Sequence, residues 1–134
     1  MYTLLSEYPG KRVTIFLDAC FSGGGRDLGL LTGARAVRIN AKEDPPKGNI
    51  VVYSASSASQ TALPYQEKEH GLFTYYLIKK LQESKGDVSY AELSDYLKSN
   101  VPIKSIIIND AEQTPLVNTS ISLGNSWKEW RIKE

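Results

Sequence analysis

The one cysteine of this chain, Cys20, stands in a segment whose residue types could support nucleophilic chemistry. The segment runs from Asp18 to Gly25 and reads Asp-Ala-Cys-Phe-Ser-Gly-Gly-Gly. Asp18 places a carboxylate two residues before the thiol, on the same side of an extended backbone, and the glycines allow the backbone to approach a ligand closely. A thiolate at Cys20 would be a nucleophile. The alternative is a small apolar residue that packs at the end of a strand, which is a frequent role of a free cysteine.

Asp18 also has two interpretations. It is either a solvated acid at the end of a strand or an acidic wall of a substrate pocket. Burial of a carboxylate is costly unless a cation pairs with it, and a substrate guanidinium could supply a bidentate partner. The residues themselves leave both interpretations open.

Two apolar runs predict the strands that would position these groups. Val13–Leu17 and Asn49–Tyr53 have strand length and many β-branched residues, a pattern typical of strands that are covered on both faces of a parallel sheet. If the two strands are parallel neighbours, Ser54 and Ser56 lie at the same edge as Cys20. The carboxyl edge of an open α/β sheet is where ligands and reacting groups gather.

The second half of the chain predicts two helices. Gly71 to Ser84 has apolar residues at helical spacing, and Ser89-Tyr90-Ala91-Glu92 is a capping box that opens a second helix to about Asn100. Pro102 marks its end. We expect a loop from Gln60 to Glu69, a short strand at Ile106–Ile108, a last strand over Leu116–Leu123, and a tail whose Trp127 and Trp130 pack back on the domain.

His70 is the only histidine of the chain. Its expected place is the amino end of the Gly71 helix, where the helix dipole disfavours a protonated imidazole. This placement favours a structural or solvent-facing role over a pairing with Cys20. The residues before Cys20 contain no histidine.

Composition and charge exclude several classes of function. The chain has 134 residues, a formal net charge of +1 and 41% hydrophobic residues, which indicates one globular domain. This net charge gives no excess of positive charge of the kind that binds nucleic acid, and no apolar run is long enough to cross a bilayer. We therefore expect neither nucleic acid nor a membrane as a partner. A single cysteine excludes an intrachain disulfide and favours a reducing, cytoplasmic location. Gly23-Gly24-Gly25 matches neither the dinucleotide-binding fingerprint nor the P-loop with its lysine. No group of Cys, His and Asp residues has the spacing of a zinc site. We therefore expect no metal and no cofactor.

The segment Asp18-Ala19-Cys20-Phe21-Ser22-Gly23-Gly24 resembles the nucleophile segment of caspase-like cysteine peptidases (peptidase C14), and in particular of the metacaspase-type branch. The resemblance extends from about Val13 to about Leu123 and includes, in the family's order, Tyr53–Ser56, Gln60–Ala62 and His70–Thr74. It implies an α/β fold, a caspase-like three-layer αβα sandwich. Residues 1–134 would form a single domain, the carboxyl-terminal portion of the catalytic domain without its amino-terminal strands.

The resemblance also implies roles. Cys20 would attack the scissile carbonyl of a protein or peptide substrate, and Asp18, with Ser54 at the pocket rim, would favour arginine or lysine before the scissile bond. Calcium is possible by family analogy only, because Asp44, Asp87 and Asp110 are too scattered for a calcium site to be carried over.

The family's general-base histidine belongs upstream of the cysteine, so we expect this chain alone to be inactive. We also expect an apolar sheet edge that pairs with another chain, either as a homo-oligomer or with the missing amino-terminal segment. The alternative is a catalytically dead caspase-like module that acts as a protein-interaction scaffold.

Overall fold

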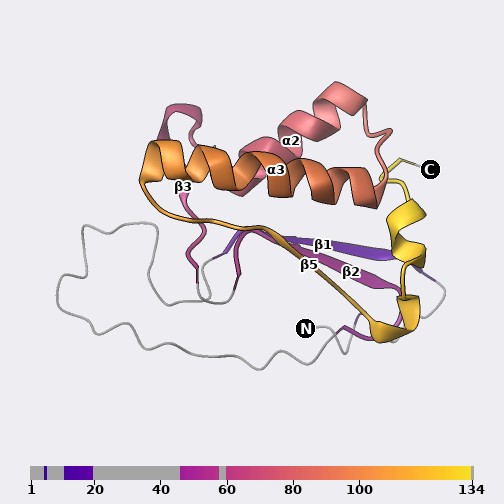
Figure 1. Ribbon diagram of the computed structural model, residues 1–134. Helices are drawn as coiled ribbons and strands as arrows, with labels where there is room; N and C mark the ends of the chain where they lie inside the picture. The colour runs from indigo at the N-terminus through magenta and orange to yellow at the C-terminus, as the bar shows by residue number, and fades with distance from the viewer. Residues whose placement is uncertain (1–4, 6–10, 20–45, 58–59, 134) are drawn as a thin grey trace.

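The computed structural model describes residues 5, 11–19, 46–57 and 60–133 of the chain. Cys20 and the glycines 23–25 lie outside the described residues. Three strands form the main sheet: β1 (Val13–Leu17), β2 (Ile50–Ser54) and β5 (Leu116–Thr119). Two α-helices, α2 (Leu72–Ser84) and α3 (Tyr90–Asn109), lie over one face of this sheet (Figure 1). The expected α/β class is confirmed, and the described residues form a sheet layer and one helical layer.

The strand β2 lies between β1 and β5 in the described sheet. It pairs in parallel with β1, with Val13 opposite Ile50 and Leu17 opposite Ser54, and it is antiparallel to β5. Both apolar runs therefore form strands, and their expected parallel pairing is confirmed.

Full burial is found for β2 but not for β1. All five residues of β2 are buried, whereas β1 is only partly buried and Phe16 is 36% exposed. The expectation that the Val13–Leu17 strand is covered on both faces is therefore wrong. The physical reason is its place at one end of the described strand order, where β2 is its only described neighbour.

The helix α2 begins and ends where its sequence pattern predicts. Leu72, Phe73 and Leu77 are its buried residues, and it ends at Lys85, which has a left-handed φ of 54°. The capping box of α3 is also confirmed: Glu92 N–H donates to Ser89 Oγ at 3.2 Å, and Ser89 N–H donates to Glu92 Oε2 at 2.8 Å. Each helix thus follows from local sequence signals.

The carboxyl half of α3 corrects the sequence analysis. The helix continues through Pro102 to Asn109, so Ile106–Ile108 is the last turn of a helix and not a strand. Leu93, Leu97, Val101 and Ser105 are buried at intervals of four residues, and this stripe continues past the proline. Packing of the stripe outweighs the backbone hydrogen bond that proline cannot donate.

Two shorter segments also differ from the prediction. The last strand ends at Thr119, and residues Ile121–Leu123 form the 3₁₀-helix η2, because the Leu123 N–H turns back to the Ser120 carbonyl at 3.2 Å. The expected loop over residues 60–69 contains ordered structure. Its elements, with the strand that follows, are β3 (Pro64–Tyr65), η1 (Gln66–Lys68) and β4 (His70–Gly71).

The core lies between the sheet and the two helices. Val51, Tyr53 and Ala55 of the β2 region pack there with residues such as Phe73 of α2 and Leu97 of α3. The Tyr53 hydroxyl donates to the Tyr90 carbonyl at 2.8 Å, and burial, followed by the nearby Tyr90, raises the pKa of Tyr53. The phenol therefore stays neutral and anchors β2 to α3.

The carboxyl-terminal tail packs on the domain, as predicted. The Trp130 ring lies edge-on to Tyr90 at 5.8 Å between centroids, and Trp127, in η3 (Ser126–Glu129), packs against the core. No α-helix in the described ranges combines the length and the apolar character that a membrane crossing requires.

Candidate active site

The carboxyl ends of β1 and β2 form the edge of the sheet at which the sequence analysis expects Asp18, Cys20 and Ser54. Their parallel pairing continues one residue past the strands, where the Ala55 N–H donates to the Leu17 carbonyl at 2.8 Å. Asp18 follows directly, and Cys20 is two residues further along the chain. The structure therefore brings the segment that leads to Cys20 beside the Ser54–Ser57 segment.

Asp18 and Ser54 reach this edge from opposite faces of the sheet. Tyr53 and Ala55 pack into the core under the helices, and side chains alternate along a strand, so Ser54 lies on the other face. Asp18 lies on the helical side, where it contacts α2. Ser54 is 9% exposed, whereas Asp18 is partly buried.

The carboxylate of Asp18 is held by the first turn of α2. The Thr74 hydroxyl donates to Asp18 Oδ2 at 2.5 Å. A Cβ atom on Gly71 would lie 1.9 Å from the same oxygen, so only glycine leaves room for it. The amino end of a helix also favours a negative charge, and Asp18 is thus fixed against α2.

Sequence reasoning missed the contacts of Thr74 and Gly71 with Asp18. Gly71 is the N-cap of α2, a position where glycine is common beside Ser, Thr, Asp and Asn. A glycine there is therefore no signal, in the sequence, of a group that approaches the backbone closely. The contact with Asp18 is evident only from the structure.

Hydrogen bonds of two glutamines, Gln113 and Gln60, hold the loop that follows β2 in place. Gln113 is fully buried and bridges this region: its Nε2 donates to the Ala55 carbonyl at 3.0 Å, and its Oε1 accepts from the Leu63 N–H at 2.9 Å. Gln60 makes a reciprocal pair with Thr114, at 2.7 and 3.3 Å. Buried polar groups are usually satisfied in this way. The loop beside the candidate site is therefore held to the segment before β5, a role that the sequence did not reveal for Gln113.

His70 is exposed, in agreement with the solvent-facing role expected for it. Its backbone pairs with Tyr65 across β3 and β4. Its side chain lines a cavity of about 330 Å³ with Lys68, Tyr75 and Lys79 among its neighbours. Asp18 and Ser54 do not line this cavity.

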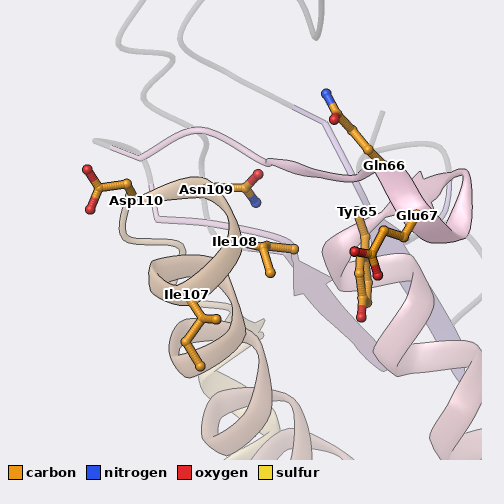
Figure 2. A pocket seen from close by; sticks show the side chains of 7 residues that line it. All are labelled: Tyr65, Gln66, Glu67, Ile107, Ile108, Asn109 and Asp110. Atoms are coloured by element: carbon orange, nitrogen blue, oxygen red, sulfur yellow. The ribbon is translucent and has the colours of Figure 1, made fainter.

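A second cavity of about 510 Å³ lies between β3–η1 and the end of α3. Figure 2 shows Ile107, Ile108 and Asp110 on one side of it, with Tyr65 and Glu67 on the other. Asp18 and Ser54 are absent from its lining as well. Within the ranges that the structure covers, no group of three His, Cys, Asp or Glu side chains could hold a metal ion.

The model of one protein family, the caspase domain, matches residues 3–123. The chain belongs to the caspase domain family. The match includes β1, the Asp18–Cys20 segment, β2, both described helices and η2. It confirms the resemblance to peptidase C14 that the nucleophile segment predicts, and a caspase domain implies a cysteine peptidase fold. Among curated proteins, none matches the chain.

Proposed function

We propose that this caspase domain is the carboxyl-terminal part of a metacaspase-type cysteine endopeptidase with Cys20 as its nucleophile. One observation carries the proposal. Asp18 stands at the carboxyl end of β1, beside the end of β2, and Cys20 follows it within the matched region. This edge of an α/β sheet is where reacting groups gather.

The proposed reaction forms a thioester. The Cys20 thiolate attacks the carbonyl carbon of the scissile peptide bond, the C–N bond breaks, and the amine leaves with a proton from a general acid. Water then hydrolyses the thioester and returns the thiol. The backbone N–H of Cys20 supplies one donor to the oxyanion. The bond changes themselves use a cysteine and a histidine.

In this proposal the general base is a histidine from outside these 134 residues. His70 is exposed and shares its cavity with Lys68 and Lys79, an environment with no acidic partner among the lining residues to orient its ring. We therefore propose that the isolated chain is inactive. It gains activity by association with a segment of the natural protein that supplies the histidine.

We further propose that the substrate carries arginine or lysine before the scissile bond. Asp18 is a partly buried residue, its Oδ1 atom is shielded from solvent, and its Oδ2 atom is held against α2. A guanidinium that reaches it would pair with it where water is partly excluded, which strengthens a charge-assisted pair. Ser54 is buried on the other face of the sheet, so in this proposal Asp18 is the main determinant of the preference for a basic residue.

Peptide reporters on the natural protein that contains these residues test the proposal. Reporters that end in arginine, lysine or aspartate are compared, with Cys20→Ala and Asp18→Asn as variants. We expect cleavage after arginine and lysine that Cys20→Ala abolishes and Asp18→Asn weakens. A preference for aspartate, or an arginine preference that Asp18→Asn leaves unchanged, contradicts the specificity.

A non-catalytic interaction module is the second candidate, because the one imidazole among the described residues, that of His70, lies in a cavity that Asp18 does not line. The same reporters separate the two. If the natural protein cleaves none of them while it still binds a protein partner, the scaffold interpretation replaces the peptidase.

A further inference from the structure

The contact between Asp18 and α2 has two parts that act on the same oxygen. The Thr74 hydroxyl donates to Oδ2 at 2.5 Å, and Gly71 leaves the space that this oxygen occupies. Thr74 and Gly71 are three residues apart, at the N-cap and in the first turn of the same helix. The position of one carboxylate oxygen is therefore set from two points of a rigid element.

The hydrogen bond of the threonine is a long-range contact. The Thr74 hydroxyl donates to a residue 56 positions away in the sequence. This bond links the start of α2 to Asp18 at the end of β1, and so places Asp18 relative to the helical layer.

We infer that Thr74 is a positioning residue for substrate recognition, and that Gly71 makes its action possible by leaving room for the carboxylate. The inference rests on the proposed function, because it concerns how Asp18 meets a basic substrate side chain. With Oδ2 bound to Thr74, the carboxylate has one orientation. A guanidinium then binds without the cost of ordering its acceptor, which is the advantage of preorganisation.

The test measures covalent labelling of Cys20 in the natural protein with two reagents. The first is a peptide electrophile that carries arginine, and the dependence of its labelling rate on concentration separates an affinity, KI, from a maximal rate, kinact. The second is iodoacetamide, which is neutral and makes no use of Asp18. The reagents thus report on recognition and on thiol reactivity separately.

Thr74→Val removes the hydroxyl while it keeps the shape of the side chain. We expect KI for the arginine electrophile to rise about tenfold, as is typical for the loss of a hydrogen bond to a charged group, while kinact and the iodoacetamide rate stay unchanged. Thr74→Ser keeps the donor and restores KI. Thr119→Val is the matched control, because Thr119 lies at the other end of β2, opposite Val51, and it leaves all three values unchanged. Thr74→Ala replaces Thr74→Val if the latter does not fold.

Each outcome decides between the claims. If Asp18→Asn raises KI and the Thr74 variants do not, the inference is wrong and the proposed function stands. If Thr74→Val lowers the iodoacetamide rate as much as it weakens the arginine electrophile, Thr74 acts on general structure and the inference is wrong. If neither reagent labels Cys20 in the folded wild-type protein, the proposed function fails and the inference fails with it.

Discussion

The substitution Gly71→Ala tests the contact at the candidate site by adding one methyl group. The new Cβ would lie 1.9 Å from Asp18 Oδ2 and 2.8 Å from its Cγ, so the carboxylate must move. Gly71 has φ −63° and ψ 145°, a conformation that alanine adopts freely. The backbone is not strained, and the effect of the substitution comes from the collision with Asp18.

The expected cost follows from the two interactions that the methyl group disturbs. Insertion of one methyl group into a closely packed site costs about 1–3 kcal/mol, and the displaced carboxylate also loses its hydrogen bond from Thr74. We expect the free energy of unfolding to fall by about 2 kcal/mol, which corresponds to a decrease of roughly 7 °C in Tm for a chain of this size.

The sharper test repeats the substitution in an Asp18→Ala background. The obstructing carboxylate is then gone. Alanine makes the unfolded chain less flexible, which adds a little stability. It is also a slightly poorer N-cap residue than glycine, which removes a little. Because the two effects nearly cancel, Gly71→Ala should change the free energy of unfolding in this background by less than about 0.5 kcal/mol. Urea unfolding of the four proteins gives the coupling energy. An equal loss of stability in both backgrounds would refute the contact with Asp18 as the cause.

Three further predictions concern the elements around the site, each measured by urea unfolding. Gln113→Ala should lower the free energy of unfolding by about 2 kcal/mol, because two backbone groups lose their side-chain partner; no loss would contradict its bridging role. Glu92→Gln should destabilise the protein at neutral pH, because hydrogen bonds from Ser89 lower the pKa of Glu92 below its usual 4.5. The difference should shrink as the pH falls below 4.5, because the stability that this carboxylate adds disappears as pH falls through its lowered pKa. A pH-independent difference would contradict this. Pro102→Ala should stabilise α3 by about 1 kcal/mol, because it restores one helical hydrogen bond; a loss would show that the ring itself packs tightly.

The sequence predicted the elements whose signals are local. The apolar runs of β1 and β2 and the capping box at Ser89 each act within a few residues, and the structure has all three. The parallel pairing of β1 and β2 was only a condition in the sequence analysis, and the burial of both faces on which it rested holds for β2 but not for β1. These features determine which edge of the sheet carries Asp18.

The features that sequence reasoning missed depend on distant partners. The continuation of α3 past Pro102 depends on a buried stripe that packs against other elements, whereas a proline viewed locally indicates a helix end. The hydrogen bond from Thr74 to Asp18 joins residues 56 positions apart, and the Gln113 bridge to Ala55 joins residues 58 apart. No periodic pattern in a single sequence reports such pairs. The positions of the site residues could therefore be predicted only as far as the sheet edge, and not their contacts.

The central claim is that Cys20 is a reactive nucleophile at the carboxyl edge of the sheet. The most direct measurement is the rate of iodoacetamide alkylation of Cys20 in the natural protein, folded and unfolded, as a function of pH, with peptide mapping to locate the label. We predict rapid alkylation of the folded protein, with a midpoint below the free-thiol pKa of about 8.5. Alkylation only after unfolding would contradict the account and assign Cys20 to packing.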